Sequence, residues 1–427
     1  MIDKKILAIV VAVVLVVAGI GVLFVFNEGE KPYRSLDRSG RLMVFGNANN
    51  DDYLDGEDVS TLEKIIAEGL DWKTEYPLAD ANQDGVVDEN DVEWVKRMVN
   101  REKMKIFYVD YYNKEQRVKS LNYPVKKCAV VGTNMLLALQ SIGATSKIIG
   151  TTGEEKDPTM FSDLSTVFKV SDSSVTRADD EKISTLKNDG LNAVFTMDST
   201  AFVKNEETIR GMGVDVVRMA TSNIRDSVSA VITLGYMLEL EERAGRYSKF
   251  CDDVYKEIET KAGTIKPEEI VTCINVTMSN SIGGLKSDYH EVTEHVGASN
   301  LFKEDVVTKK FEIGDEWLLN DTYDADFIIH YKQFPMKNPN LTEIWDSNGQ
   351  YFTKMNAYKN GKYSIINSYM PLVVRMAYTA QVMYPELYGE SYGDVICQYW
   401  IDNFQDNMKG SYLASENLLV IDSSVMA

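Results

Sequence analysis

From residue 103 onward, short apolar runs alternate with amphipathic stretches along the chain. KCAVVG, KIIGTTG and GVDVVRMAT are apolar and rich in β-branched residues, which is typical of buried strands. Between them, TNMLLALQSIGA has the pattern of a helix, and DDEKISTLKNDGLNAVFTMD that of a helix, a turn and a strand. Alternating helices and buried strands predict an α/β lobe with a mostly parallel sheet.

A second series of the same kind follows an almost unbroken helical region, residues 223–261. Apolar or aromatic residues recur there every three or four positions and predict one buried face: Ala244, Tyr247, Phe250, Val254 and Ile258. Beyond this region, EEIVTCINVT and GKYSIINSY are predicted strands, DYHEVTEHVGASNLF a helix, DEWLLNDTYDADFIIHY a helix and strand, and MPLVVRMAYTAQVMYPELY a closing helix. The pattern therefore predicts two α/β lobes joined by one long helix.

The N-terminal segment, KKILAIVVAVVLVVAGIGVLFVFNEGE, is apolar and uncharged throughout residues 6–26. This length matches the roughly 20 residues that a membrane-spanning helix needs. A cleaved signal peptide has a shorter apolar core and a small-residue cleavage site, so we predict an uncleaved transmembrane helix. Lys4 and Lys5 favour a cytoplasmic N-terminus. The expected location is the cell membrane, with a single-pass anchor and the bulk of the chain extracytoplasmic.

Two segments, NANNDDYLDGED and DANQDGVVDEND, carry side-chain oxygens at positions 1, 3, 5, 9 and 12. Their starts differ by 33 residues (80 − 47), so they form an internal duplication, and each leads into an amphipathic helix. Hard oxygen ligands on a tight turn suit calcium, with a backbone carbonyl as the ligand at position 7. The predicted calcium ligands are Asn47, Asn49, Asp51, Tyr53, Asp55 and Asp58 in the first loop and Asp80, Asn82, Asp84, Val86, Asp88 and Asp91 in the second.

The first loop departs from the calcium pattern, because Asn47 stands at position 1 and Asp52 where glycine is usual. It offers three carboxylates against four in the second loop, so we predict that the second loop binds calcium more tightly. The alternative is an acidic turn in which Asp58 and Asp91 only cap the helices. The pair, over residues 41–101, resembles a small all-α dockerin module. That resemblance implies a cohesin-type partner, and a metal-stiffened spacer is the other interpretation.

Composition excludes some classes of function. The net charge of −20 argues against a nucleic-acid partner, because the phosphate backbone would be repelled. Four cysteines lie far apart in apolar surroundings, which predicts buried free thiols: Cys128, Cys251, Cys273 and Cys397. The chain has no GxSxG, no P-loop, no GxGxxG after a strand and no HExxH, so we do not expect an enzyme.

Residues 103–413 resemble the solute-binding proteins of ABC importers that take up iron–siderophores, haem and cobalamin. The matching segments, in the family's order, are VVGTNMLLALQSIGATSKIIGTTG, EKISTLKNDGLNAVF, the long helix, EVTEHVGASNLF, EWLLNDTYDADFIIHY and KNGKYSIINSYM. The resemblance implies two Rossmann-like lobes bridged by a rigid helix, a chelated-metal or corrinoid ligand held between them, and delivery of that ligand to an ABC permease. The predicted parts are a membrane anchor (1–30), the calcium module (41–101), a first lobe (104–221), a helical linker (222–263) and a second lobe (264–427).

Ligands of open α/β sheets bind outside the carboxyl ends of the strands, and polar or aromatic residues there are the candidates. In the first lobe these are Thr133, Asn134, Thr152, Asp198 and Ser199. In the second lobe they are Met278, Asn280, Tyr289, His290, His330, Tyr331, Tyr369 and Arg375. Aromatic rings suit a planar or chelated ligand, although ordinary packing is the alternative for each tyrosine. We expect a preformed pocket that closes little on binding, because a long helical joint resists wide bending.

Two acidic residues are candidates for contact with the permease. Members of the resembled family carry one glutamate on each lobe that pairs with permease arginines, and Glu181 and Glu316 stand at the matching helix starts. The alternative is favourable placement of an acid at a helix N-terminus, which needs no partner. A different function also stays open at this point. It is that of a cell-surface scaffold or adhesion protein that docks through the calcium module and senses a ligand through its lobes.

Overall fold

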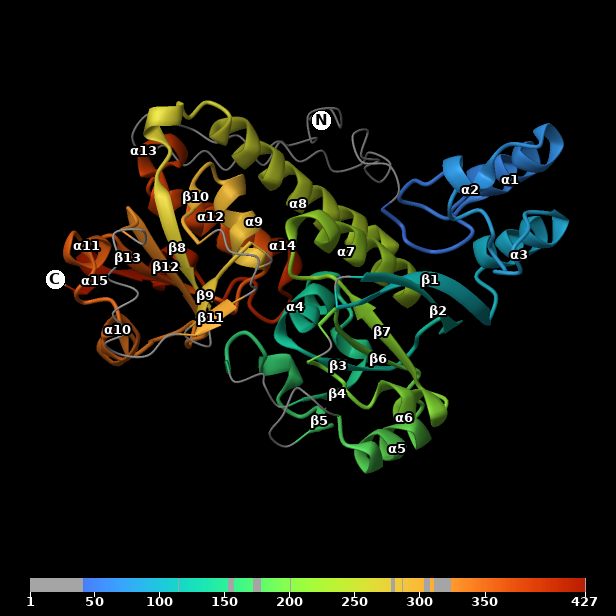
Figure 1. The fold of residues 1–427 in the computed structure, drawn as a ribbon. Coiled ribbons are helices and arrows are strands. Elements are labelled where there is room, and N and C mark those ends of the chain that lie inside the picture. Colours follow the sequence, from blue (N-terminus) through green and yellow to red (C-terminus); the bar gives the residue numbers. More distant parts are fainter. Residues whose placement is uncertain are drawn as a thin grey trace, which may run out of the picture.

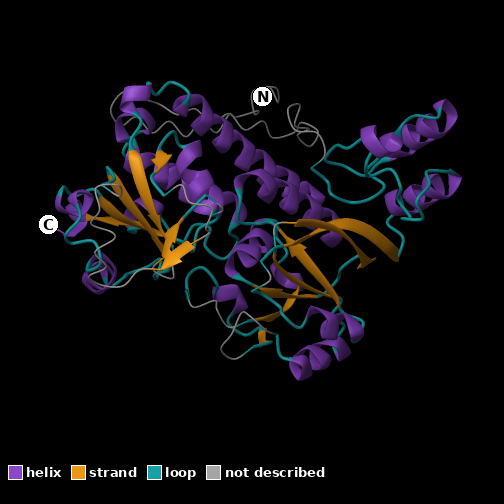
Figure 2. Cartoon of the chain, in the orientation of Figure 1, coloured by secondary structure: helices purple, strands orange, loops and turns teal. Residues whose placement is uncertain are grey.

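The computed structural model describes residues 41–113, 115–152, 157–171, 178–199, 201–277, 281–285, 287–302, 308–310 and 324–426. Two α/β lobes lie next to each other, and a long helix, α8, crosses from one to the other (Figure 1). A small helical module lies beside the first lobe, at the N-terminal end of the described chain (Figures 1 and 2). The predicted architecture of two α/β lobes and a long joining helix is therefore observed.

The first lobe is a five-stranded parallel sheet in the order β5-β4-β3-β6-β7. Every residue of β3 is buried, as expected for a central strand with a continuous apolar sequence. The strands are β3 (Cys128–Val131), β4 (Ile148–Thr151), β5 (Phe168–Lys169), β6 (Ala193–Met197) and β7 (Asp215–Met219). The helices are α4 (Thr133–Ser141), α5 (Asp180–Asn188) and α6 (Glu206–Gly211), with 3₁₀ turns at Thr145–Lys147 and Ser162–Leu164.

The second lobe contains a seven-stranded sheet in the order β11-β9-β8-β12-β13-β14, with β10 paired to β8. Its central strands β8, β12 and β13 are parallel, whereas β9, β11 and β14 pair antiparallel, so this lobe is more mixed than predicted. The strands are β8 (Thr272–Val276), β9 (Ser281–Gly283), β10 (Ser299–Asn300), β11 (Thr308–Lys310), β12 (Phe327–Lys332), β13 (Tyr363–Asn367) and β14 (Val420–Asp422). The helices are α9 (Asp288–His295), α10 (Leu341–Gly349), α11 (Asn356–Lys359), α12 (Leu372–Met383), α13 (Pro385–Tyr388), α14 (Tyr392–Phe404) and α15 (Ser423–Met426), with 3₁₀ turns at Pro267–Glu269 and Ala414–Glu416.

The linker consists of two helices, α7 (Ile224–Leu238) and α8 (Glu241–Ala262), and not of one almost unbroken helix. Glu239 ends α7 in the left-handed conformation, with φ of 56°, and the chain turns back there. The two helices pack closely at Gly235, where a Cβ would lie 2.4 Å from the Cβ of Ala244. The predicted apolar face of α8 is confirmed, since all five of its residues are buried.

Helix α8 contacts both lobes along its length. Near its start, the Nε of Arg243 donates to the carbonyl oxygen of Ser141 in the first lobe, at 3.0 Å. Near its end, the hydroxyl of Tyr388 in the second lobe donates to the carbonyl oxygen of Ile258, at 3.1 Å. The joint between the lobes is therefore a packed helix, as the resemblance implied.

A β-hairpin that we did not predict precedes the first lobe. Strands β1 (Met104–Tyr112) and β2 (Glu115–Tyr123) pair antiparallel and lie beside β7. The hydroxyl of Tyr108 donates to the carbonyl oxygen of Val216 in β7, at 3.3 Å. The hairpin thus extends the first lobe on the side that faces the helical module, residues 41–101.

The module contains α1 (Gly56–Glu68), α2 (Trp72–Glu75) and α3 (Glu89–Val99). It is joined to the rest of the protein and is not a free spacer. Its first residues add a bridge between Val44 and Tyr108, and Leu42, Leu54 and Met98 belong to the main hydrophobic core. Arg41 pairs with Asp52 of the first loop and with Asp252 of α8, which ties the module to the helical joint.

All four cysteines are buried free thiols, which confirms the prediction for them. The predicted anchor, residues 6–26, lies outside the described residues. In the part of the chain that the structure describes, no helix has the length and apolar character needed to cross a membrane.

Candidate ligand-binding site

The carboxyl ends of the strands in the two lobes meet at a junction between the lobes. Thr133 follows β3, and its hydroxyl lies 3.4 Å from the Nε2 of Gln333, which follows β12. The backbone N–H of Met336 donates to Asp157 of the first lobe, at 2.7 Å. These contacts confirm Thr133 as a junction residue, whereas Gln333 and Asp157 were missed because no local pattern distinguishes them from other loop residues.

Arg375, in the first turn of α12, is the charged residue at the centre of this junction. Only 4% of it is exposed, and its Nη2 donates to the Oδ1 of Asn134 in the other lobe over a long distance of 3.4 Å. The guanidinium lies 5.9 Å from the centre of the Tyr289 ring. Within the described ranges it has no carboxylate partner, and its Nε has no hydrogen-bond acceptor. Asn134 and Arg375 were both predicted to lie at the cleft, and the structure brings them together.

A small cavity of about 30 Å³ lies next to Asn134, among helices α4, α7, α8 and α12. Asn134 lines it from the first lobe, Leu372 and Val373 from the start of α12, and Thr221 from the loop after β7. The hydroxyl of Thr221 is buried without a hydrogen-bond partner. A cavity of this size holds roughly two water molecules and not a chelate. The expected preformed pocket is therefore not provided by this cavity.

The candidate tyrosines form part of the packing around Arg375. Tyr331 is fully buried, its hydroxyl lies 2.9 Å from the Oγ1 of Thr379, and its ring stacks on Tyr289 with 4.1 Å between centroids. Tyr369 meets Phe161 of the first lobe edge to face, at 5.7 Å. Tyr289 and Tyr369 thus lie at the junction, whereas Tyr331 lies behind Tyr289 and supports it.

The candidate histidines do not face the junction cavity. His330 is fully buried in the core of the second lobe, and its Nδ1 lies 3.1 Å from the hydroxyl of Tyr363. Burial lowers the pKa of His330 to about 3, so this ring is neutral at physiological pH. His290 lies on α9, and its Nδ1 is 3.3 Å from the Nδ2 of Asn300 in β10. Neither histidine is part of the set that surrounds Arg375.

The remaining candidates are divided between described and undescribed residues. Thr152 and Asp198 are buried. Glu181 is exposed in the first turn of α5, where it can meet a partner or simply interact with the helix dipole. Met278, Asn280 and Glu316 lie outside the described residues.

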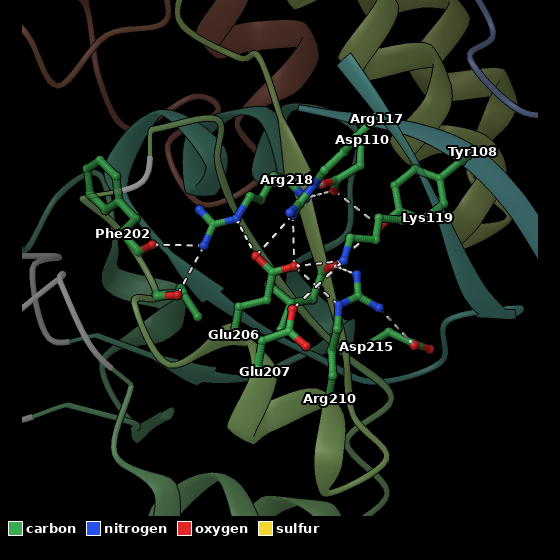
Figure 3. A network of polar contacts seen from close by, with 12 residues as sticks. Tyr108, Asp110, Arg117, Lys119, Phe202, Glu206, Glu207, Arg210, Asp215 and Arg218 are labelled. Atoms are coloured by element: carbon green, nitrogen blue, oxygen red, sulfur yellow. Dashed lines mark hydrogen bonds and ion pairs between the residues drawn. The ribbon is translucent and has the colours of Figure 1, made fainter. Parts of the chain in front are cut away.

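A polar network fixes the loop after β6, at the edge of the junction (Figure 3). Arg218 of β7 donates to Glu206 of α6 at 2.8 Å and to four main-chain carbonyl oxygens within residues 197–203, one of them that of Ser199. Arg117 of the hairpin reaches the same carboxylate at 2.8 Å, and also Asp110 at 2.6 Å. The network therefore connects the hairpin, α6 and the cleft-side loop.

The surroundings of Glu206 and Asp110 shift the pKa values of these two carboxyl groups in opposite directions. Burial alone would raise the pKa of Glu206, but hydrogen bonds and charges of Arg218 and Arg117 outweigh it and lower the pKa to about 2. Asp110 is fully buried, and burial raises its pKa despite the backbone N–H of Arg218 and the Arg117 guanidinium. The carboxylate of Glu206 is thus strongly stabilised in the folded state.

The two calcium-type loops have the same internal hydrogen bonds. In the first, the N–H of Asp51 donates to the side-chain oxygens of both Asn47 and Asn49, at 3.1 Å each. In the second, the N–H of Asp84 does the same to Asp80 and Asn82, at 3.2 and 2.8 Å. The oxygens at positions 1 and 3 are therefore drawn toward one point in each loop, which supports the predicted duplication.

The carboxylates at position 12 close both loops in the same way. Asp58 accepts from the N–H groups of Asn49 and Asp55, and Asp91 from those at the equivalent positions. Both carboxylates also complete capping boxes at the starts of α1 and α3, so capping and metal binding are compatible. Burial raises the pKa of both, to about 7 for Asp58.

The loops differ at position 6. Gly85 adopts φ of 95°, whereas Asp52 has no such positive φ and pairs with Arg41. Among the described residues, no three His, Cys, Asp or Glu side chains lie close enough to hold a metal ion by themselves. The oxygen set in each loop also includes asparagine and carbonyl oxygens, and a mixed set of this kind fits the chemistry of calcium.

Neither a family model nor a curated protein matches this sequence. Among solved structures, the fold is similar to that of periplasmic solute-binding proteins. One from Veillonella parvula is 16% identical with a TM-score of 0.51, over 70% of this chain and 93% of that chain. The TroA-like periplasmic binding protein FepB, also from Veillonella parvula, is 14% identical with a TM-score of 0.53, over 73% and 99%.

A third similar structure is the molybdate periplasmic binding protein MolA of a Haemophilus influenzae ABC transporter, bound to molybdate. It is 14% identical with a TM-score of 0.54, over 68% of this chain and 95% of that chain. At these identities the similarity shows a shared fold.

Proposed function

We propose that the chain is an extracytoplasmic solute-binding protein of an ABC importer, held at the cell membrane by its N-terminal segment. It captures a chelated metal compound, such as an iron–siderophore, haem or a corrinoid, and delivers it to the permease. The observation that carries this proposal is the meeting of two sets of strand carboxyl ends across one junction, spanned by α8. The similar periplasmic binding proteins have the same fold.

A chelate needs more room than the cavity of about 30 Å³ provides. Binding therefore requires the lobes to separate at the junction. The hydrogen bonds between Arg375 and Asn134 and between Gln333 and Thr133 are both long, at 3.4 Å, and are the first to open. The packed helix α8 limits the size of this opening.

The binding function is tested by purifying the full chain in detergent and measuring quenching of its fluorescence by ferric siderophores, haemin and cyanocobalamin. Saturable quenching at micromolar concentration by at least one compound supports the proposal. Native mass spectrometry of the purified protein identifies a ligand that is retained from the cell. If none of the three classes binds, the chelate-uptake function is rejected.

Calcium is proposed as a resident metal of both loops, with tighter binding in the second. When bound, it would hold the converging oxygens of each loop together and stabilise the module. We expect Asp84→Ala to remove more calcium affinity than Asp51→Ala, because the second loop has the larger number of carboxylates. Calorimetric titration of the full chain with calcium measures this difference. No calcium-dependent heat, or the opposite order of the two variants, contradicts the proposal.

Glu181 and Glu316 are proposed as the two permease contacts. Reversing both charges with Glu181→Lys and Glu316→Lys is expected to abolish uptake in cells while ligand affinity of the purified chain stays unchanged. Unchanged uptake would leave Glu181 with a role in α5 alone.

The alternative of a cohesin-docking scaffold is less favoured by the geometry. In the described chain, the first loop faces α8 through the Arg41 contacts, so this side of the module is already covered by the protein itself. A cohesin-type partner would have to bind the opposite side, where Asp84 and Val86 are exposed.

A further inference from the structure

The charge of Arg375 is not compensated within the described protein. The chain has 65 Asp and Glu residues and a net charge of −20, yet no described carboxylate lies within ion-pair distance of this buried guanidinium. Its hydrogen bond to Asn134 is long, its other neighbour Tyr289 is uncharged, and its Nε has no acceptor. Burial of a cation without an anion is costly, so this arrangement indicates that the anion comes from another molecule.

Two helix N-termini point to the same place. Helices α4 and α12 begin after Gly132 and Pro371, neither of which provides a side-chain cap. The first-turn N–H groups of a helix have no partner within the helix and carry partial positive charge. Asn134 in the first turn of α4 and Leu372 and Val373 in that of α12 line the cavity beside Arg375.

The polar side chains around this cavity offer further hydrogen-bonding capacity. The hydroxyl of Thr221, which lines the cavity, is at least nine-tenths buried and has no partner. The acids closest along the junction are already occupied: Asp157 accepts three backbone N–H groups, and Glu291 accepts that of Ile224 at the start of α7. No described carboxylate thus pairs with Arg375, and the Thr221 hydroxyl is able to donate to an anion.

We infer that the junction binds an anionic oxygen group of the ligand, a carboxylate or an oxyanion, between Arg375 and the starts of α4 and α12. This inference rests on the proposed function, because it specifies the chemistry of the same site. The cavity has the size of such a group and not of a whole chelate. In the closed structure the Oδ1 of Asn134 takes the position of the anion's oxygen, and the ligand replaces this weak contact.

The test compares four probes on the full chain in detergent. Inorganic molybdate is a free oxyanion, ferric citrate and haemin carry carboxylates, and cyanocobalamin is neutral overall but carries a phosphodiester group. Affinities are measured by calorimetry for the wild type, Arg375→Gln and Arg375→Lys. Arg246→Gln is the matched control, since this arginine of α8 is 64% exposed. Thermal unfolding of each variant without ligand confirms that it is folded.

At least one anionic probe should bind the wild type. Arg375→Gln should then weaken it about 10- to 100-fold, the usual effect of losing a charge-assisted hydrogen bond. Arg375→Lys should keep part of the affinity, and Arg246→Gln should change nothing. Binding of molybdate indicates a free oxyanion as the ligand, whereas binding of ferric citrate or haemin alone indicates a carboxylate on a chelate.

Two results would overturn the inference, and they differ in what they say about the function. If every probe that binds does so equally well to the wild type and to Arg375→Gln, the anion site is rejected while solute binding stands. If none of the four probes binds, the anion site and the chelate-uptake function both fall.

Discussion

Two arginines are buried, one in each lobe, and their surroundings differ sharply. Arg218 of β7 is 1% exposed and Arg375 of α12 is 4% exposed. Arg218 pairs with Glu206 and also donates to four carbonyl oxygens of the neighbouring loop. Arg375 donates weakly to Asn134 and has no carboxylate partner among the described residues.

From this difference we infer a structural role for the charge of Arg218 and a binding role for that of Arg375. A buried ion that is fully hydrogen-bonded and paired holds its surroundings in one arrangement. A buried ion that is incompletely paired adds little to the stability of the folded state. It can, however, increase the affinity for a ligand that brings the missing anion. Arg218 therefore holds the loop after β6 in place, whereas Arg375 is the residue that we propose for contact with the solute.

The largest effect is expected from Glu206→Gln. This change leaves Arg218 and Arg117 without the carboxylate that they share, and loss of one partner from a buried pair costs about 3–5 kcal/mol. The free energy of unfolding, measured in urea, checks the size of the loss. Glu207→Gln is the control, because this neighbour is 85% exposed and its removal should change stability by less than about 0.5 kcal/mol. Equal effects of the two substitutions would contradict the structural role of the network.

A smaller effect is expected from acid. The pKa of Glu206 falls from 4.5 to about 2 on folding, so the stabilisation is complete above about pH 4.5 and is lost as the pH falls toward 2. The difference in unfolding free energy between the wild type and Glu206→Gln should therefore shrink by about 2–3 kcal/mol across this range. A difference that stays constant with pH would show that the Glu206 carboxylate titrates normally.

The smallest effect on stability is expected from Arg375→Met. Replacement of an unpaired buried charge by an apolar side chain of similar length is expected to change the unfolding free energy by about 1 kcal/mol or less, or to raise it. Arg218→Met serves as the comparison and should lose several kcal/mol, because Glu206 and four carbonyl oxygens lose their donor. If both methionine variants lose the same stability in urea, the two arginines do not differ in role.

The order of helices and strands could be predicted from the sequence because short apolar strands alternate with amphipathic helices in each lobe. The face of α8 and the two calcium-type loops were likewise visible, since both depend on spacing within a short segment. The β1–β2 hairpin was missed because its strands mix lysines and glutamates with tyrosines and bury only part of one face. The break at Glu239 was missed because no glycine or proline marks it.

The candidate site was predictable only to the level of the strand ends. His330 and Tyr331 are adjacent in β12, so their side chains point to opposite faces of the sheet. In a strand buried on both faces, the sequence does not show which face lies toward the other lobe, and the structure places His330 on the far one. Pairings such as Arg375 with Asn134, 241 residues apart, depend on how the lobes meet and have no local signal.

The contacts of Arg41 have a mechanical consequence. Any tension on the chain that precedes this residue passes first through its ion pairs to Asp252, in the middle of α8, and to Asp52. The load then acts on the helix that spans both lobes and on β1, to which residues 43–45 are hydrogen-bonded. In the membrane-anchored protein that we propose, the attachment is therefore at the helix that spans both lobes.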